Sequence, residues 1–389
     1  MPNAIEPPLL EVVVTARPSW ARVKSLVINY AELTDQSSVR VTLLGPAVSK
    51  RYGNLSSQVP AWLRFEQIPA LQDSDSLAAV AMSCTSGANV LINKWAASRP
   101  DCVLVVADRT ETLGVSLAAA LMQIPLIHLQ GGEISGSIDD KVRDTNSKLA
   151  DLHLTTNLET ARRLIEMGED PSRVFAIGCP SVDIVNSRIN EKQLDRNSTS
   201  EILGGVGSVF SLTESFGIIM FHPDTLNEIE NLEWVRILIA LTKEIPINWL
   251  WFWPNPDHGS ESVSHEIRAA RELGNLGNVR FVINLAPEAF VDLALAAKVM
   301  VGNSSFGIRE ASFIGLPVIN VGKRQAGRQK ALNVFDFPEL KTLESLIIKI
   351  LEHISTSRYP SSQIYGSGSA GKAAAKIIAQ WAPSLKVRV

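Results

Sequence analysis

The sequence has little cysteine, no excess of positive charge and no long apolar run. Its 389 residues include 3 cysteines, 37 Lys and Arg, and 40 Asp and Glu, so the net charge is 37 − 40 = −3. Cys84, Cys102 and Cys179 cannot all pair, which argues against a disulfide framework or a cysteine-built zinc site. The charge balance argues against a broad nucleic-acid-binding surface, although a local basic pocket is compatible with it.

The amino-terminal segment lacks the features of a targeting sequence. The residues MPNAIEPPLLEVVVTARPSW contain no basic cluster before a short, strand-like apolar run. This pattern is typical of neither a signal peptide nor a membrane-spanning helix. We therefore expect a cytoplasmic protein whose partner is a small molecule, with no nucleic acid and no membrane involved.

The chain is long enough for two domains or three, and 46% of its residues are hydrophobic, as in ordinary globular proteins. Strand-like and helix-like segments alternate in both halves, which predicts mostly parallel sheets flanked by helices. Strands are expected at residues 10–14, 39–44, 102–106, 125–129, 217–221, 248–253, 279–283, 299–301 and 317–321. Helices are expected at residues 22–30, 77–95, 112–122, 233–243, 306–314 and 370–381.

These segments predict an α/β fold with two Rossmann-like domains that face a cleft. The first domain comprises residues 1–186 and is joined by a carboxyl-terminal helix at 370–389, and the second comprises 207–369. An irregular polar segment at 186–207 is expected to link them. Ligands of such sheets bind at the carboxyl ends of strands, so the residues directly after strands are the candidates.

An acid and a cation follow the strand predicted at 102–106. Asp108 and Arg109 stand there, just before a predicted helix. Two interpretations fit: capping of that helix, or a carboxylate for proton transfer beside a phosphate-binding arginine.

Glycines and acids follow the strand predicted at 125–129. The glycines let the backbone approach a ligand closely, and Glu133, Asp139 and Asp140 are expected to crowd near the cleft. Crowded carboxylates in a partly dry site raise one another's pKa, as an acid/base catalyst at neutral pH requires. The alternative is a solvated loop before a capped helix. His128 has apolar neighbours and is expected to be a core histidine with satisfied hydrogen bonds.

His222 follows the first strand of the second half and precedes a proline. A role as general acid/base or as a phosphate-binding charge suits this position. A turn histidine without a function fits equally well.

The strongest local signal is the turn Asn303-Ser304-Ser305 between a strand and a helix. Free backbone N–H groups and the helix dipole make such a turn an anion site, suited to a diphosphate. Glu310, further along that helix, is placed to accept hydrogen bonds from ribose hydroxyls. A basic loop with glycines, which contains Arg324 and Arg328, follows the next strand. The turn and this loop together favour a binding site for a nucleotide diphosphate over an ordinary helix start.

Several familiar motifs do not occur. No Walker A sequence is found, and the one GxGxxG pattern, at residues 366–371, follows no predicted strand, so ATP hydrolysis and NAD binding lose support. No His/Asp/Glu cluster has metal-ligand spacing, and no GxSxG elbow is present. We therefore expect neither a metal nor a cofactor.

Short motifs follow one another in a fixed order along almost the whole chain. They are Ala16-Arg17-Pro18, Tyr52-Gly53-Asn54, Asp108-Arg109, Gly131-Gly132-Glu133, Ser137-Ile138-Asp139-Asp140, Gly178-Cys179-Pro180-Ser181, His222-Pro223, Gly302-Asn303-Ser304-Ser305 and Arg324-Gln325. In this combination the chain resembles the hydrolysing UDP-N-acetylglucosamine 2-epimerases of sialic- and legionaminic-acid pathways. That family includes the epimerase half of the animal UDP-GlcNAc 2-epimerase/ManNAc kinase.

The resemblance implies a glycosyltransferase-B-like fold in which the second domain holds most of the nucleotide. It implies loss of the proton on sugar carbon 2 and of UDP, which gives a 2-acetamidoglycal, and then addition of water to yield the free manno-configured sugar. Neither NAD nor a catalytic metal is implied. Asp108, Asp139 and His222 match catalytic positions of the family. The positions that match UDP contacts are Arg17, Arg109, Ser304, Ser305, Glu310 and Arg324, with Leu285 and Phe290 beside the base.

Two residues depart from the family pattern. Gln130 stands where characterised members typically carry a glutamate used in proton transfer, and an amide cannot do that work. Asp144 stands where the family usually has His after Arg143. The proton work then shifts to Asp108, Glu133 or Asp139; alternatively, Gln130 hydrogen-bonds a changed substrate, such as a 2,4-diacetamido-6-deoxy sugar, or turnover is lost.

The predicted catalytic residues are thus Asp108, Glu133, Asp139 and His222. The predicted substrate-binding set adds Gln130, Arg143, Asn303 and Arg328 to the matched UDP contacts. The leading hypothesis is a hydrolysing 2-epimerase of UDP-GlcNAc or of its 2,4-diacetamido-2,4,6-trideoxy relative. The alternatives are a glycosyltransferase of the same fold and a nucleotide-sugar-binding pseudoenzyme. A homo-oligomer, dimer or tetramer, is expected from the family.

Overall fold

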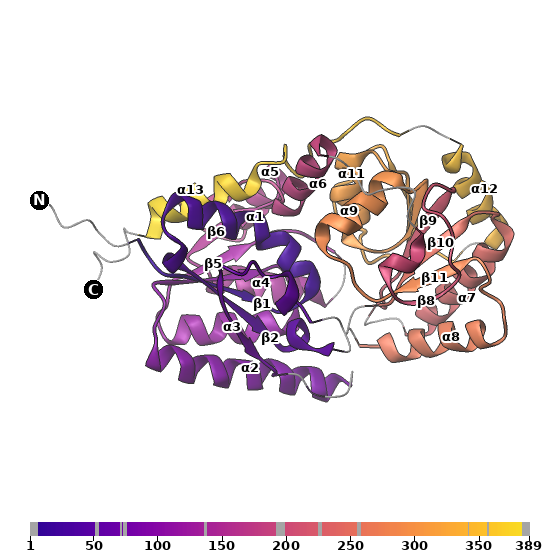
Figure 1. The fold of residues 1–389 in the computed structure, drawn as a ribbon. Coiled ribbons are helices and arrows are strands. Elements are labelled where there is room, and N and C mark those ends of the chain that lie inside the picture. Colours follow the sequence, from indigo (N-terminus) through magenta and orange to yellow (C-terminus); the bar gives the residue numbers. More distant parts are fainter. Residues whose placement is uncertain are drawn as a thin grey trace, which may run out of the picture. The chain divides into compact units, whose positions relative to one another are not determined.

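The computed structural model describes residues 7–50, 54–70, 72, 76–135, 138–191, 199–224, 228–254, 258–340, 342–355 and 358–382. The chain divides into two compact units. Unit 1 comprises Met1–Glu133, Asp139–Ile184 and Gly366–Val389, and unit 2 comprises Ile134–Ile138 and Val185–Tyr365. Each contains one sheet with helices on its faces (Figure 1).

The sheet of unit 1 has the strand order β3-β2-β1-β4-β5-β6-β7, and all its strand pairs are parallel. Its strands are β1 (Leu10–Val14), β2 (Val39–Leu44), β3 (Arg64–Ile68), β4 (Cys102–Val106), β5 (Leu126–Leu129), β6 (Leu152–Thr155) and β7 (Val174–Ala176). This is the order of a Rossmann fold, and the direction in which strands are added reverses between β1 and β4.

Helices cover both faces of this sheet. They are α1 (Arg17–Leu33), α2 (Leu77–Ala97), α3 (Thr110–Leu121), α4 (Asp139–Leu149), α5 (Leu158–Glu166), α6 (Pro180–Asn190) and α13 (Ala370–Trp381). Helices α1 and α13 lie on one face and α2 and α3 on the other (Figure 1). In β1, Leu10, Val12 and Val14 pack toward α1 and α13, whereas Val13 packs toward α2 and α3. Burial on both faces explains why the strands are almost continuously apolar.

The last helix, α13, returns to unit 1 and is fixed there by Asp183. The Asp183 carboxylate accepts hydrogen bonds from the backbone N–H groups of Ala370 (2.8 Å) and Gly371 (2.7 Å), and from Ser25 Oγ (2.6 Å). A carboxylate at a helix amino terminus satisfies free N–H groups and complements the helix dipole. A Cβ on Gly371 would lie 2.0 Å from Ser25 Oγ, so glycine allows α13 to approach α1.

The sheet of unit 2 has the order β14-β13-β12-β9-β10-β11-β8. Its strands are β8 (Val206–Gly207), β9 (Phe216–Met220), β10 (Asn248–Phe252), β11 (Val279–Val282), β12 (Val299–Gly302), β13 (Val318–Val321) and β14 (Val334–Phe337). Only β8 pairs antiparallel among these strands. The other six repeat the Rossmann order, with the reversal between β9 and β12. The helices are α7 (Glu228–Glu244), α8 (Ser260–Glu272), α9 (Pro287–Ala296), α10 (Ser305–Ile308), α11 (Glu310–Ile314) and α12 (Leu343–Ile354).

The structure confirms the predicted α/β class with two Rossmann-like domains and corrects two local predictions. The expected linker at 186–207 is helical at its start, because α6 continues to Asn190, and residues 206–207 form β8; residues 192–198 lie outside the described part. The single helix expected at 306–314 is wrong. It is broken into α10 and α11 at Arg309, whose buried guanidinium turns back to donate to Ser305 Oγ at 2.8 Å.

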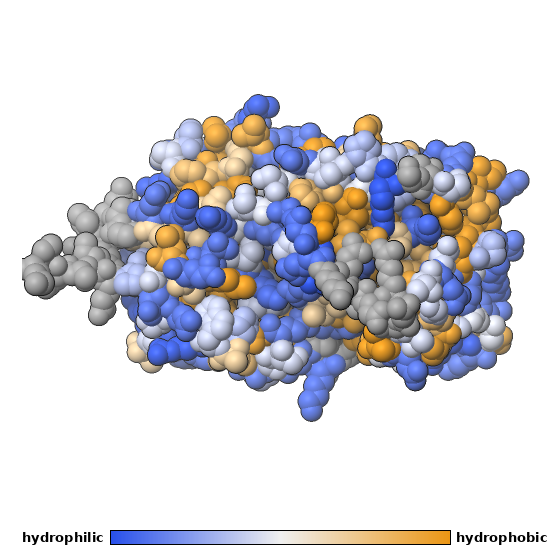
Figure 2. All heavy atoms as spheres, turned by 45° about the horizontal axis from the view of Figure 1, so that its top comes forward, coloured by the Kyte–Doolittle hydropathy of each residue, from blue (hydrophilic) through white to orange (hydrophobic). Residues whose placement is uncertain are grey.

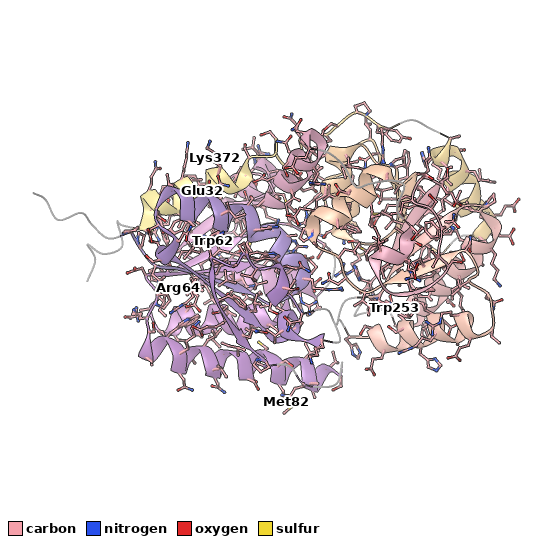
Figure 3. The ribbon with its side chains drawn as sticks, in the orientation of Figure 1. Glu32, Trp62, Arg64, Met82, Trp253 and Lys372 are labelled. Carbon is pink, nitrogen blue, oxygen red and sulfur yellow. The ribbon has the colours of Figure 1, made fainter. Side chains whose placement is uncertain are left out.

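Hydrophobic and hydrophilic residues are interspersed over the face shown in Figure 2. Helix α2 is different, because Lys94 is its only charged residue and Leu77, Met82 and Val90 are exposed on it. Met82 projects outward from α2 (Figure 3). Among the described helices, none combines the length and the apolar character that a bilayer crossing would need.

Glu11, in the middle of β1, is a fully buried carboxylate on the face covered by α2. Its oxygens accept hydrogen bonds from Lys94 Nζ (2.7 Å), Thr42 Oγ1 (2.7 Å), Trp95 Nε1 (3.1 Å) and the Arg40 guanidinium. Burial alone would raise the pKa of Glu11, but the Lys94 ammonium, with the hydrogen bonds from Lys94 and Thr42, lowers it below its usual 4.5. A carboxylate with a lowered pKa stabilises the fold at neutral pH.

We predict that Glu11→Gln lowers the free energy of unfolding of unit 1 by about 3 kcal/mol at pH 7. This is the low end of the range for breaking a buried pair, because Lys94 and Arg40 keep some contact with solvent. The folded pKa is depressed, so the difference from the unsubstituted chain is full above pH 4.5 and shrinks as the pH falls through the folded pKa. Denaturant titrations at several pH values measure it.

Glu66→Gln is the matched control, because Glu66 pairs with the same Lys94 at 3.2 Å but is half-exposed. Its substitution should cost less than about 1 kcal/mol. A Glu11→Gln cost as small as that of Glu66→Gln would contradict the role of the buried carboxylate.

Candidate functional site

The first group of predicted residues lies where β4 ends, beside the point at which the strand order of unit 1 reverses. Ala107 has a left-handed backbone with φ +57°, and the carboxylate of the next residue, Asp108, accepts a hydrogen bond from Arg143 of helix α4. Arg109 is the amino-terminal cap of α3, without a side-chain cap hydrogen bond. Helix capping was one interpretation of this segment, but the Asp108 carboxylate pairs with Arg143 of α4.

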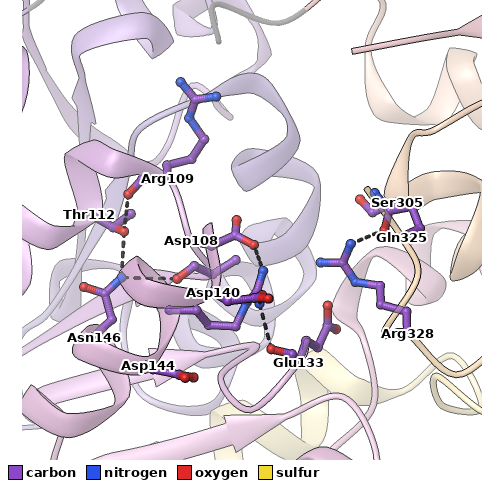
Figure 4. Close-up of polar contacts among 12 residues, drawn as sticks. Asp108, Arg109, Thr112, Glu133, Asp140, Asp144, Asn146, Ser305, Gln325 and Arg328 are labelled. Atoms are coloured by element: carbon purple, nitrogen blue, oxygen red, sulfur yellow. Dashed lines mark hydrogen bonds and ion pairs between the residues drawn. The ribbon is translucent and has the colours of Figure 1, made fainter. Parts of the chain in front are cut away.

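Arg143 of α4 joins Asp108, Asp140 and the backbone of Glu133 into one cluster. It is fully buried, its Nη2 donates to Asp108, and its Nη1 donates to Asp140 and to the backbone oxygen of Glu133 at 2.7 Å (Figure 4). Burial alone would lower the pKa of Arg143, but Asp108, Glu133 and Asp140 raise it well above its ordinary value. The arginine is therefore always charged, and its positive charge stabilises the ionised carboxylates around it.

The other predicted acids, Glu133 and Asp139, are close to Arg143 in the chain or in space. The buried Glu133 accepts a hydrogen bond at Oε1 from Thr156 Oγ1 (3.0 Å), and Asp139, partly exposed, is the first residue of α4. The structure thus brings Asp108, Glu133 and the start of α4 together at one edge of the sheet. No group of three or more His, Cys, Asp or Glu in the described ranges is arranged to hold a metal ion.

The two residues that depart from the family pattern are both engaged. Gln130 is buried just after β5 with φ +68°, and its Nε2 donates to Cys179 Sγ at 3.0 Å. Asp144 forms a bidentate ion pair with Arg163 of α5, with both N–O distances 2.7 Å. Asp144 is therefore committed to a contact between helices and is not aimed at the acids beside Arg143.

His128 is confirmed as a buried histidine whose ring nitrogens both form hydrogen bonds, to Ser147 Oγ and to the Ala107 backbone oxygen. Asn146 contacts the same oxygen, and the sequence reasoning did not identify it. The available signal was spacing: Asn146 and Ser147 lie three and four residues after Arg143, on the same face of α4.

Arg17 lies on the other side of the same reversal, as the first residue of α1 after β1. Its side chain is partly removed from solvent, and burial lowers the pKa of its guanidinium to about 10. It remains positively charged at neutral pH. Arg109 has a nearby acid, with its Nε 3.4 Å from Glu111 Oε2.

In unit 2 the corresponding reversal lies between β9 and β12, and predicted residues follow both strands. Asn303 Oδ1 accepts from the His222 backbone N–H (2.8 Å), and Asn303 Nδ2 donates to the His222 backbone oxygen (2.7 Å). The amide thus ties the ends of the two strands together. Gly302 has φ +144°, and a Cβ there would lie 2.0 Å from the Met220 oxygen, so only glycine permits this close approach.

The turn after β12 continues into α10. Ser304 is the amino-terminal cap of α10, and its side chain accepts from the Phe306 N–H at 3.4 Å. Ser305 Oγ accepts from Arg309, and Arg309 Nε lies 4.0 Å from Glu310 Oε2. Because α10 ends after one turn, a helix dipole contributes less here than the continuous helix would have.

The predicted basic loop is tied to this turn. Gln325 Nε2 donates to the Asn303 backbone oxygen at 2.9 Å, and Gln325 Oε1 accepts from Arg328 Nη1 (Figure 4). Arg328 is buried and Arg324 is half-buried. The structure therefore places the loop beside the Asn303 turn.

An aromatic cluster lies next to the turn. Phe290 of α9 meets Phe306 edge-on, with ring centroids 4.6 Å apart, and meets Phe252 edge-on at 5.0 Å. Leu285, before α9, is partly buried. These apolar side chains lie beside the Asn303 turn, and contact with a nucleotide base is the role predicted for Leu285 and Phe290.

The sequence and fold comparisons agree on one class: nucleotide-sugar enzymes built from two Rossmann-like domains. The profile of the family "UDP-N-acetylglucosamine 2-epimerase" matches residues 32–379. The chain belongs to this family, and the resemblance of its motifs is thereby confirmed.

Curated relatives include two described as hydrolysing. The GDP/UDP-N,N'-diacetylbacillosamine 2-epimerase (hydrolyzing) of Campylobacter jejuni is 27% identical over 87% of this chain and 86% of its own length. The UDP-N,N'-diacetylbacillosamine 2-epimerase (hydrolyzing) of Legionella pneumophila is 30% identical over 69% of this chain and 68% of its own. The UDP-N-acetylglucosamine 2-epimerase of Neisseria meningitidis is 34% identical over 60% of this chain and 59% of its own.

Solved structures share the fold. The UDP-GlcNAc 2-epimerase of Neisseria meningitidis bound to UDP-GlcNAc aligns with a TM-score of 0.74 and 18% identity, over 96% of this chain and 100% of that one. The enzyme of Methanocaldococcus jannaschii, in complex with UDP-GlcNAc and UDP, aligns with a TM-score of 0.75 and 14% identity, over 95% and 99%. The fold is thus glycosyltransferase-B-like, as predicted.

We predict that Asn303→Leu frees the end of β9, because it leaves the buried N–H and C=O of His222 without their partners. Each unsatisfied group costs about 1–3 kcal/mol, so unit 2 should lose roughly 2–6 kcal/mol of stability. Hydrogen exchange in a peptide that contains His222 should become faster. The control is Asn320→Leu, on the neighbouring β13, which removes a hydrogen bond to Asp336 and should leave that peptide protected. Equal protection in both variants would contradict the role of Asn303.

Proposed function

We propose that this chain is a hydrolysing 2-epimerase that converts a UDP-2-acetamido sugar to the free manno-configured sugar and UDP. The sugar is N-acetylglucosamine or its 2,4-diacetamido-2,4,6-trideoxy relative. Family membership and the names of the two hydrolysing relatives support this reaction. The observation that carries it is the acid cluster around Arg143, at the sheet edge where Rossmann folds bind their ligands.

In this proposal unit 2 binds the nucleotide. The turn of Asn303, Ser304 and Ser305 and the cations Arg324 and Arg328 hold the diphosphate. Glu310 accepts hydrogen bonds from the ribose, and Leu285 and Phe290 lie against the base. In unit 1, Arg17 and Arg109 add positive charge. A UDP leaving group carries negative charge as it departs, so fixed cations lower the barrier to its release.

The reaction then needs two proton transfers. In the first step a base removes the proton from sugar carbon 2, the bond between carbon 1 and the UDP oxygen breaks, and a double bond forms between the two carbons. In the second step water adds to carbon 1, and a proton returns to carbon 2 on the opposite face. Carbon 2 is not oxidised, so no hydride acceptor is required. We assign the proton transfers to Asp108, Glu133 and Asp139, with His222 as a further acid/base.

Gln130 supports a second candidate function, which is binding of a nucleotide sugar without turnover. Its amide cannot carry a proton, and it is fixed to Cys179 inside unit 1. If the three carboxylates do not take over the proton work, the chain binds a nucleotide sugar without turning it over.

We predict that incubation with each UDP-sugar in deuterated water, followed by NMR, gives UDP and free sugar with deuterium at carbon 2. Asp108→Asn should slow UDP release at least 100-fold, the scale of a lost general acid/base. Asp144→Asn is the matched control, since this acid of α4 pairs with Arg163, and it should retain activity.

The other outcomes identify the alternatives. An epimer that is still attached to UDP would indicate a non-hydrolysing enzyme. Tight binding without turnover would indicate a binding protein, and sugar transfer only after an acceptor is added would indicate a transferase. Unchanged UDP release in Asp108→Asn would refute the role of Asp108.

We also propose that the chain forms a homo-oligomer, a dimer or a tetramer, through the outer face of α2. The exposed apolar residues of this face and its lack of negative charge support a two-fold contact. A two-fold contact brings identical surfaces together, and such surfaces repel each other only where like charges meet. Met82→Glu should shift the sedimentation coefficient to that of a monomer. Leu273→Glu, an exposed apolar residue that ends α8, should not. A monomeric unsubstituted chain would refute the proposal.

A further inference from the structure

The backbone just before Asp108 has an uncommon conformation. Ala107 has φ +57°, a left-handed value that residues with a side chain rarely adopt and that persists where surrounding contacts impose it. The parallel ladder still reaches Ala107, whose N–H donates to the Leu129 oxygen at 2.8 Å. The chain then leaves the sheet, and this turn sets the direction of the Asp108 side chain.

Two buried side chains donate to the Ala107 oxygen. His128 Nε2 lies 2.9 Å from it and Asn146 Nδ2 lies 3.2 Å from it. A carbonyl oxygen can only accept, so Nε2 of His128 carries the proton. In a neutral imidazole Nδ1 must then accept, and the hydroxyl of Ser147, 2.9 Å away, is the donor.

The imidazole is neutral under ordinary conditions. The pKa of His128 is lowered to about 4, chiefly by burial and also by the nearby His153 and Arg143, against the opposite effects of the Ala107 carbonyl and Asp108. The donor and acceptor directions of the contacts are therefore fixed around neutral pH.

The network also holds the backbone on the other side of Asp108. Asn146 Nδ2 donates to Thr112 Oγ1 at 2.8 Å, and Thr112 Oγ1 donates to the Arg109 backbone oxygen at 2.5 Å (Figure 4). The carbonyl groups of Ala107 and Arg109, on either side of Asp108, thus both accept hydrogen bonds from this network.

One face of α4 controls all of these contacts. Asn146 reaches the turn directly, Ser147 reaches it through His128, and Arg143 binds the Asp108 carboxylate itself. The space is tight, because a Cβ on Gly131 would lie 2.7 Å from Ser147 Oγ and 2.9 Å from His128 Nδ1. Glycine at 131 lets the histidine sit between α4 and the turn.

We propose that His128 is a positioning residue for Asp108: its Nε2–H, together with Asn146, holds the left-handed turn at Ala107 and so aims the Asp108 carboxylate at Arg143 and the substrate. This role rests on the proposed function of Asp108 in proton transfer. The imidazole itself transfers no proton in the reaction.

The test compares two amide substitutions of His128. The amide nitrogen of glutamine reaches about as far as Nε2, whereas that of asparagine ends near Nδ1. His128→Gln therefore keeps a donor for the Ala107 oxygen, and His128→Asn loses it. We expect His128→Asn to lower kcat for the UDP-sugar about 100-fold, the effect of a misplacement on the order of 1 Å. KM should change less than about threefold, because the nucleotide contacts are untouched, and His128→Gln should restore most of kcat.

His153→Asn is the matched control. His153 is buried on the neighbouring strand in register with His128, but its Nε2 pairs with Glu169 (3.2 Å) and not with the Ala107 turn. It should lower Tm without lowering kcat selectively. If His128→Asn loses Tm as His153→Asn does and keeps its kcat, His128 only stabilises the core and the proposal is wrong. Equal kcat losses in His128→Asn and His128→Gln would also overturn it.

A second measurement does not depend on turnover. The guanidinium N–H protons of Arg143, observed in protein labelled with 15N-arginine and assigned with Arg143→Lys, report the contact with Asp108. They should shift and exchange faster in His128→Asn, and remain unchanged in His128→Gln and His153→Asn. If the unsubstituted chain turns over no UDP-sugar, the proposed function fails, while these signals still decide the role of His128. If His128→Asn does not fold, Asn146→Ala, which removes the second donor, replaces it with the same expectations.

Discussion

A guanidinium that is completely removed from water needs partners for its charge, and in unit 1 this need organises the site. Desolvation of an ion costs several kcal/mol, and only well-placed opposite charges and hydrogen bonds offset it. Arg143 finds them on three segments: the residue that follows β4, the backbone after β5, and the first turn of its own helix. If any one of these segments moves alone, the charge loses one of its partners. The acids proposed to move protons therefore also hold the local fold together, and the same contacts that place them limit how they can be changed.

The two sheets show why the candidate residues lie where they do. A parallel sheet with helices on both faces offers a ligand only the ends of its strands, and the reversal of strand order opens a crevice there. In unit 1 the reversal is flanked by Arg17 and by Asp108 with Arg109. In unit 2 it is flanked by His222 and by the turn that begins at Asn303. The predicted site residues of both units thus lie at the same position of the same topology.

The sequence predicted best those elements whose structure depends on neighbouring residues in the chain. The strands at 10–14, 39–44 and 102–106 are predicted to the residue, because buried parallel strands are nearly continuous apolar runs. The edge strand β3 was missed, since its exposed polar residues Arg64, Glu66 and Gln67 hide the pattern. The start of the expected linker is helical because the polar side chains of α6 suit the exposed face of a helix.

The candidate site shows the same division. Residues directly after strands, such as Asp108 and Asn303, could be identified from the order of elements alone. The break at Arg309 could not, because the apolar and polar residues around it are compatible with a continuous helix. For Asn146, the spacing from Arg143 could indicate its face of α4, but its partner could not be predicted, since that partner is a backbone oxygen 39 residues away. A hydrogen bond of that range leaves no periodic trace in a sequence.

The return of α13 to unit 1 has a consequence for the order in which the chain can mature. The apolar face of α1 and β1 is completed by Ala374, Ala375 and Ile378, and the cap on α13 is supplied by Asp183, almost two hundred residues earlier. A ribosome synthesises all of unit 2 before it reaches this helix. Most of unit 1 is therefore synthesised first, but its core is completed last. Until α13 is made, one apolar surface of unit 1 stays uncovered, although all segments of unit 2 have already been synthesised. During synthesis, that surface is where a chaperone, or an unwanted contact with another chain, would find the nascent protein.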